Sequence, residues 1–203
     1  RAQEQYDRSC LEARIPPELN PPLFERAVGL LMYGDKVFCT ALRTSENEVL
    51  TAKHCFLDAS TGKPSDDVKA VLSSKGQMWF SYEAEPNNRF GVCKESLPKA
   101  GARFGPDGDN VKLQISRPNL PAAPLKWVTT PIKTGTSLYL RGFFPFTGSA
   151  VSSVDRLRST AAGGCYAHSA SERCFFHACQ TTPIMSGSPI FTRPEPGALS
   201  NTL

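Results

Sequence analysis

Hydrophobic positions along this chain form short runs, separated by clusters of Gly, Pro, Asn, Asp and Ser. Short runs rich in β-branched and aromatic residues are typical of β-strands, and few windows carry the helical period of about 3.6 residues. The pattern therefore predicts an all-β protein whose strands recur at a spacing typical of Greek-key barrels. The clearest predicted strands cover residues 28–32, 37–42, 48–51, 68–72, 77–82, 111–115, 137–141 and 188–191.

The composition of the 203 residues is that of a folded globular protein, with 40% hydrophobic and 21% charged residues. The net charge is +4, and the basic residues are dispersed without a run or interleaved aromatic residues. This distribution argues against a nucleic-acid-binding protein. No apolar stretch approaches the roughly 18 residues of a membrane-spanning helix, so we expect no membrane span.

Seven cysteines are many for a protein of a reducing compartment, so the count favours an oxidising one. Their odd number leaves one thiol without a partner inside the chain. The chain begins at Arg1 without a methionine or an apolar leader, as expected of a mature or trimmed product.

Two short segments, far apart in the sequence, carry the candidate chemistry. Residues 51–55 (TAKHC) place His54 after an apolar strand, and residues 185–191 (MSGSPIF) place Ser186 on a turn of small residues. A serine hydroxyl is a poor nucleophile unless an adjacent base takes its proton, so the pair predicts nucleophilic catalysis. Histidine suits the role of base because it exchanges protons near neutral pH.

A third segment offers the carboxylate that would orient the imidazole of His54. Asp109 precedes alternating apolar positions of a predicted strand, and Asp107 in the same turn is the alternative. The order His54, Asp109, Ser186 is the chain order of the chymotrypsin arrangement, and differs from the orders in subtilisin and the α/β-hydrolases.

These motifs resemble those of a known enzyme family. Residues 49–55 (VLTAKHC) resemble the V-L-T-A-A-H-C motif of trypsin-like serine proteases. Residues 186–191 (SGSPIF) are closer to the S-G-S-P-V-F of the bacterial glutamyl-endopeptidase-like branch, in which a lysine also precedes the histidine. The resemblance extends from about residue 28 to residue 191.

The resemblance implies two six-stranded Greek-key barrels of the chymotrypsin type, with the site in the cleft between them. We expect a first barrel over 27–118, carrying His54 and Asp109, and a second over 119–203, carrying Ser186. Residues 1–26, with two Pro-Pro pairs, are expected to form an N-terminal extension. Because the family continues further beyond its serine, the second barrel is expected to be partial, its remainder lost or supplied by a second polypeptide.

The resemblance also implies disulfide bonds. It makes Cys39–Cys55 the first expected pair, tying adjacent strands beside His54, and Cys165–Cys179 the next, closing the loop ahead of Ser186. The remaining cysteines, Cys10, Cys93 and Cys174, are left unassigned.

An alternative interpretation of the second cysteine cluster is a zinc site. Three thiols and two imidazoles lie within a short stretch that could fill a tetrahedral zinc shell, and the resulting function would be a zinc-stapled interaction domain. The cluster comprises Cys165, His168, Cys174, His177 and Cys179. The cysteine usage favours disulfides instead, and we expect no metal and no cofactor.

The family resemblance implies an oxyanion hole formed by the backbone N–H groups of Ile184 and Ser186. Ile184 departs from the usual glycine, and a β-branched residue resists the backbone angles that glycine permits. The expected function is a secreted or periplasmic serine endopeptidase that acts on proteins or peptides through His54, Asp109 and Ser186. The alternative is a weak or inactive homologue that serves as a binding or regulatory module.

Overall fold

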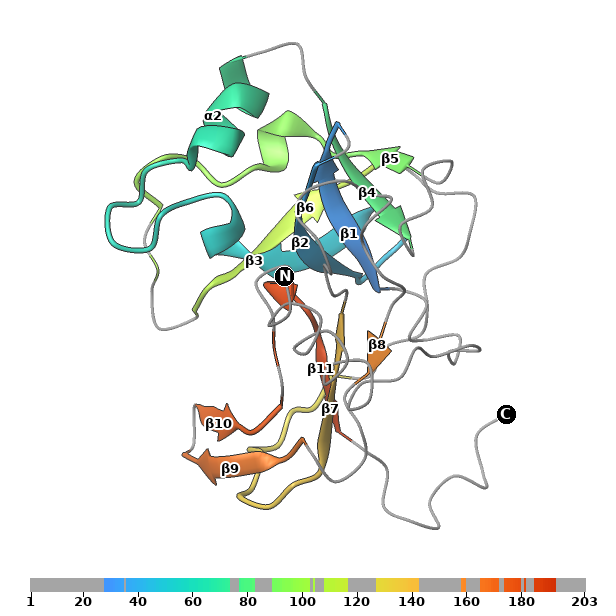
Figure 1. The fold of residues 1–203 in the computed structure, drawn as a ribbon, viewed down its shortest axis with the longest axis vertical. Coiled ribbons are helices and arrows are strands. Elements are labelled where there is room, and N and C mark those ends of the chain that lie inside the picture. Colours follow the sequence, from blue (N-terminus) through green and yellow to red (C-terminus); the bar gives the residue numbers. More distant parts are fainter. Residues whose placement is uncertain are drawn as a thin grey trace, which may run out of the picture.

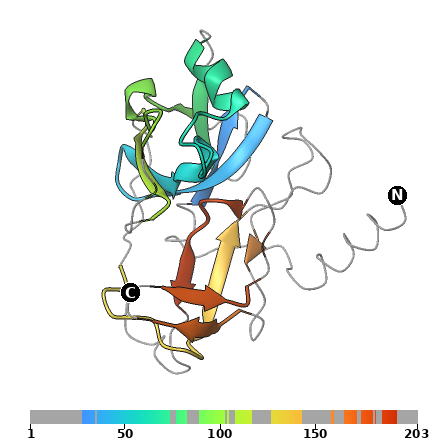
Figure 2. The same cartoon turned by 90° about the vertical axis from the view of Figure 1, so that its left-hand side faces the viewer.

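The computed structural model shows two groups of β-strands, one above the other (Figure 1). The same two groups are visible after a quarter turn (Figure 2). Strands β1 to β6 form the upper group with helix α2, and β7 to β11 form the lower group. The structure describes residues 28–34, 36–73, 77–82, 89–102, 104, 108–116, 127–142, 158–159, 165–171, 174–179, 181 and 185–192.

The upper group is one six-stranded antiparallel sheet in the order β5-β4-β1-β2-β3-β6. Its strands are β1 (Val28–Tyr33), β2 (Lys36–Arg43), β3 (Glu48–Ala52), β4 (Met78–Tyr82), β5 (Arg89–Gly91) and β6 (Asn110–Gln114). Strands β1 and β2 are joined by a tight turn, and nearly all of their residues are buried. Because successive side chains point to opposite faces of a sheet, this burial means that both faces of the two strands are covered.

The two edge strands of this sheet bond to each other, so the sheet closes into a barrel. Val92, directly after β5, forms an antiparallel bridge with Ile115, directly after β6. The N–H of Cys93 donates to the carbonyl of Gln114, and the N–H of Ser116 donates to that of Gly91, both at 2.8 Å. Closure removes the unpaired edges that an open sheet would expose.

The barrel encloses a hydrophobic core whose residues come from every one of its strands or the turns beside them. Its members include Leu31, Val49, Phe80, Val92 and Leu113, each at most 3% exposed. Inward-facing residues on facing strands meet directly, since Val49 on β3 lies opposite Leu113 on β6. This pairing fixes the register of the two strands that lead into the candidate site.

One predicted strand is wrong. Residues 68–72 lie in helix α2 (Asp66–Ser73), not in a strand. The Ser65 hydroxyl accepts the N–H of Val68, which caps the helix, and Val68 and Val71 bury one face while Lys69 and Ala70 face outward. The β-branched run suggested a strand, but capping and a three-residue apolar spacing favour a helix.

The lower group contains five described strands in two sheets. One sheet has the order β11-β7-β8, from β7 (Leu138–Gly142), β8 (Arg158–Ser159) and β11 (Ile190–Thr192). The other pairs β9 (Ala167–Ala170) with β10 (Phe175–His177). A bridge between Ser137 and Tyr166 connects the two sheets. A second core lies here and includes Leu138, Leu140, Ala167 and Met185.

The all-β class is confirmed, and seven of the eight predicted strands overlap observed ones. The sequence pattern missed β5, β8, β9 and β10, which are two to four residues long and too short to show a clear period. Only the first barrel closes within the described residues, so a complete second barrel and the domain limits at 27–118 and 119–203 stay predictions. The predicted extension over 1–26 lies outside the described residues.

Two disulfides are present, and both are pairs that the family resemblance implied. Cys39 on β2 bonds to Cys55, and Cys165 bonds to Cys179 within the second core. Cys93 and Cys174 are exposed free thiols, and Cys10 lies outside the described residues. No helix in the described part of the chain is long and apolar enough to cross a lipid bilayer.

We expect Leu113→Ala to destabilise the first barrel by about 3 kcal/mol, because it leaves a cavity between β6 and the core. The matched control is its neighbour Lys112→Ala, an exposed residue whose ion pair with Glu48 at the surface contributes less than about 1 kcal/mol. Urea denaturation of both variants measures the difference. Equal stability of the two variants would contradict the observed burial of Leu113.

Candidate active site

His54 lies on a short turn that follows strand β3. The turn is the 3-10 helix η2 (Lys53–Cys55), closed by the N–H of Phe56 donating to the carbonyl of Lys53 at 3.0 Å. The disulfide from Cys55 to Cys39 ties the residue after His54 to strand β2. The histidine is therefore held from both sides, by β3 on one and by a covalent bond on the other.

Asp109 lies beside this turn because of the register between β3 and β6. Ala52, the last residue of β3, pairs with Asn110, the first residue of β6. One carboxylate oxygen of Asp109 accepts the backbone N–H of His54 at 2.7 Å, and the other bonds to Nδ1 of its imidazole. Two contacts from one carboxylate fix both the position and the rotation of the ring.

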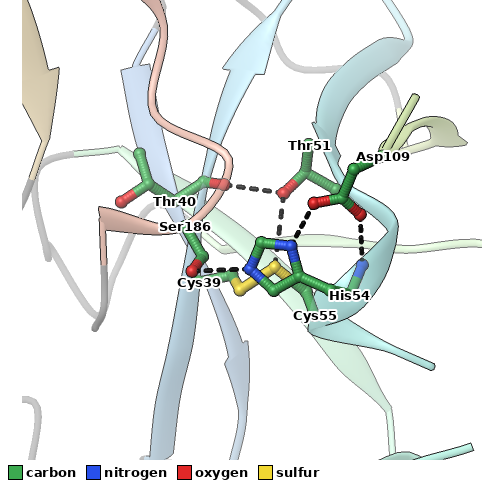
Figure 3. Close-up of a disulfide and its surroundings, with 7 residues drawn as sticks. All are labelled: Cys39, Thr40, Thr51, His54, Cys55, Asp109 and Ser186. Carbon is green, nitrogen blue, oxygen red and sulfur yellow. Dashed lines mark hydrogen bonds and ion pairs between the residues drawn. A yellow bond between two sulfur atoms is a disulfide. The ribbon is translucent and has the colours of Figure 1, made fainter. Parts of the chain in front are cut away.

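Ser186 reaches the other side of the imidazole from the lower group of strands (Figure 3). Its Oγ lies 2.8 Å from Nε2 of His54. The serine sits on a turn between Met185, which is buried in the second core, and strand β11; the N–H of Ser188 donates to the carbonyl of Met185 at 2.8 Å. The three residues that the sequence singled out are thus brought together in one hydrogen-bonded chain.

The exposure of the site lets it exchange protons with a bound molecule or with water. The side chains of His54 and Asp109 are each 43% exposed. An ion pair at this exposure contributes little to stability. The fixed backbone contacts, rather than the charge attraction, therefore hold the aspartate against the histidine.

The turn that carries Ser186 packs closely against the first barrel, with no room for a side chain at Gly187. Gly187 has a φ of +83°, and a Cβ built on it would lie 2.2 Å from the carbonyl oxygen of Thr40 and 2.3 Å from Oγ1 of Thr51. Only glycine combines this backbone conformation with such a close approach. Gly187 thus allows Ser186 to come within hydrogen-bonding distance of His54.

Thr40 and Thr51 support this contact, although the sequence motifs did not point to either residue. The N–H of Thr40 donates to the carbonyl of Ser186 at 2.8 Å, and the Thr51 hydroxyl donates to the carbonyl of Thr40 at 2.7 Å. Both threonines are at most 3% exposed. Two threonines within largely apolar runs are the signal that could have identified them, since buried hydroxyls need partners.

Two predicted site residues lie outside the described residues. These are Ile184, the expected oxyanion donor, and Asp107, the alternative to Asp109. The oxyanion hole therefore stays a prediction. Of the two aspartates, Asp109 is the one whose carboxylate meets His54.

The second disulfide takes up two of the residues of the alternative zinc site. Cys165 and Cys179 bond to each other, which removes two of the three thiols that the zinc interpretation required. Among the described residues, no group of three or more His, Cys, Asp or Glu side chains is arranged to hold a metal ion. The N–H of Cys179 donates to Nδ1 of His177 instead.

The loop after η2 is held by one aspartate. A single carboxylate oxygen of Asp58 accepts the hydroxyls of Ser60 and Thr61 and both of their backbone N–H groups, at 2.6–3.0 Å. These bonds lower the pKa of Asp58 from 3.8 to about 2, and the bond from the Ser60 hydroxyl has the largest effect. Hydrogen bonds to a carboxylate favour its charged form.

Comparison with solved structures identifies the fold. The chain is similar to a Glu endopeptidase solved in complex with MPD, with a TM-score of 0.59 and 14% identity over 89% of this chain and 80% of that chain. It is also similar to human heparin binding protein, with a TM-score of 0.55 and 16% identity over 88% of this chain and 79% of that chain. A third similar structure is neuropsin, a serine protease of mouse brain, with a TM-score of 0.53 and 14% identity over 87% of this chain and 82% of that chain.

The fold is therefore the chymotrypsin-like fold of the trypsin-like serine proteases. The expected likeness to this class, a Glu endopeptidase included, is confirmed at the level of fold. No protein-family model and no curated protein sequence matches the chain.

We expect Gly187→Ala to be much more destabilising than Gly135→Ala. Both glycines have φ near +84°, so both variants carry a similar backbone strain of about 1 kcal/mol. A Cβ at Gly135 meets nothing within 4 Å, whereas one at Gly187 collides with Thr40 and Thr51. Chemical denaturation should show a further loss of about 2 kcal/mol for Gly187→Ala. Equal losses in the two variants would contradict the close packing of this turn.

The bonds to Asp58 predict a specific dependence of stability on pH. Because its pKa is lowered to about 2 on folding, its contribution is complete above the unfolded value of 3.8 and is lost as the pH falls through about 2. Asp58→Asn should therefore be less stable than the wild type at pH 6, and the difference should shrink as the pH falls from about 4 towards 2. Urea denaturation across this range measures the difference, and a difference of unchanged size at pH 2 would contradict the prediction.

Proposed function

We propose that this protein is a serine endopeptidase in which Ser186 is the nucleophile, His54 the general base and Asp109 the residue that orients the base. The observation that carries the proposal is the 2.8 Å separation between Nε2 of His54 and Oγ of Ser186, with Nδ1 of the same ring bonded to Asp109. A base within this distance of a hydroxyl can remove its proton as the hydroxyl attacks.

In the proposed reaction, Ser186 Oγ attacks a peptide carbonyl carbon while its proton passes to Nε2 of His54. The imidazolium then gives this proton to the leaving amine, and an acyl-enzyme on Ser186 remains. Water, deprotonated by His54, hydrolyses the ester and releases the acid. Asp109 stays ionised throughout and stabilises the imidazolium through Nδ1.

The substrates proposed are proteins or peptides, since the solved structures that share this fold include a Glu endopeptidase and the serine protease neuropsin. The two disulfides agree with an oxidising compartment, so we place the protein outside the cytoplasm, secreted or periplasmic. A second polypeptide that completes the lower group of strands stays a prediction from the sequence.

The second candidate function is that of a weak or inactive homologue that binds rather than cleaves. Ile184 favours it, because a β-branched residue stands where the family has the glycine of the oxyanion hole. The loss of one such donor lowers turnover by about a hundredfold or more. A measurement of covalent reactivity separates the two functions.

We expect a fluorophosphonate to label the wild-type protein covalently, because it traps an activated serine as a stable adduct. Ser186→Ala should abolish labelling and His54→Ala should reduce it to background. Asp109→Asn should slow it by about four orders of magnitude, since the ring would no longer be held in the correct tautomer. Fluorescence of the labelled band over time gives the rates.

Ser188→Ala is the matched control, since it removes a neighbouring hydroxyl that has no hydrogen-bond partner within the described part of the chain. It should be labelled at the wild-type rate. A folded wild-type protein that takes up no label would contradict the endopeptidase and favour the binding module. Equal labelling of Ser186→Ala and the wild type would contradict the role of Ser186.

A further inference from the structure

Lys53, the residue before His54, connects the histidine turn to the aspartate turn through both its backbone and its side chain. Its N–H donates to the carbonyl of Asp109, and its ammonium Nζ lies 3.4 Å from the carbonyl oxygen of Gly108. Residues 53 and 54 thus bond to residues 108 and 109 at four points, counting the two contacts between His54 and the Asp109 carboxylate. Lys53 supplies the one contact that depends on a long, charged side chain.

The ammonium of Lys53 also lies against an aromatic ring that belongs to the first barrel. Nζ is 5.4 Å from the centroid of the Phe104 ring, within the range of a cation–π interaction. Phe104 is itself packed against the core of the barrel. The lysine side chain is half-buried and therefore links the aspartate turn to a fixed part of the molecule.

We propose that Lys53 is a positioning residue, whose ammonium holds the Gly108–Asp109 peptide so that the Asp109 carboxylate stays bonded to both N–H groups of His54. This inference rests on the proposed function, because the position of Asp109 matters for catalysis only if His54 acts as the base. The carboxylate is 43% exposed, so water competes for its hydrogen bonds and a loose turn would lose them. A displacement of about 1 Å in such a site lowers the rate by up to about a hundredfold.

Electrostatics and positioning predict opposite effects when this lysine is removed. His54 becomes a cation when it takes the serine proton, and a neighbouring ammonium opposes that charge. If Lys53 acted only through its charge, removing the charge would raise the reaction rate. If it positions Asp109, removing it lowers the rate. The sign of the effect therefore separates the two roles.

The test compares four variants by their rates of covalent reaction with a fluorophosphonate. Lys53→Met keeps the length of the side chain and removes the ammonium, and should lower the maximal rate of labelling about tenfold to a hundredfold, with little change in the affinity for the probe. Lys53→Arg, which can still donate to Gly108 and stack on Phe104, should stay within about threefold of the wild type. Phe104→Leu, which removes the aromatic ring and keeps the lysine, should be labelled at a rate between those of Lys53→Met and Lys53→Arg. Lys112→Met, the control for loss of one surface lysine, should react as the wild type.

The second readout is the ¹H NMR signal of the proton on Nδ1 of His54, which reports its hydrogen bond to Asp109 without any reaction. This proton should exchange faster with water in Lys53→Met than in the wild type, and Lys53→Arg should restore it. An unchanged signal together with wild-type labelling of Lys53→Met would overturn the proposal, and so would faster labelling.

The measurements distinguish a failure of the proposed endopeptidase function from a failure of the role proposed for Lys53. If the wild type takes no label, the proposed function fails, while the NMR comparison still decides whether Lys53 holds Asp109. If the wild type and Lys53→Met are labelled alike with the same Nδ1 proton signal, the role of Lys53 fails and the function stands.

Discussion

The candidate site depends on one close contact between the two groups of strands, where the Ser186–Gly187 turn lies against Thr40 and Thr51. One backbone hydrogen bond, from Thr40 N–H to the Ser186 carbonyl, and the absence of a side chain at Gly187 set the distance. A hydrogen bond between a base and a nucleophile tolerates only a few tenths of an ångström. The buried threonines therefore matter to the site although neither bonds to the imidazole in the described structure.

The other half of the site is internal to the first barrel. Strands β3 and β6 are neighbours in a closed sheet, and their register pairs Ala52 with Asn110, so that His54 meets Asp109 just beyond the paired residues. Asp109 and His54 therefore stay together whatever the lower strands do, and only Ser186 comes from elsewhere. Lys53 adds to this internal arrangement, since it belongs to the same turn as His54 and reaches the peptide before Asp109.

The sequence predicted most of the strands and singled out the three residues that meet at the candidate site, because apolar periodicity and the motifs around His54 and Ser186 are local signals. It could not predict helix α2, where the capping by Ser65 outweighs the strand propensity of Val68 and Val71. It also gave no role to Thr40 and Thr51, whose importance comes from a contact with Gly187 across a long sequence separation. Contacts of that kind depend on tertiary structure, which a residue pattern does not contain.

The contact between Ser186 and His54 is tested most directly by an NMR comparison of the imidazole Nε2 signals in the wild type and in Ser186→Ala. The chain has three histidines, His54, His168 and His177, so each signal can be assigned by substitution. Because Ser186 Oγ is 2.8 Å from Nε2 of His54, its removal should shift the His54 signal and leave the other two unchanged. A His54 signal that does not move in the folded variant would contradict the hydrogen bond between Ser186 Oγ and His54 Nε2.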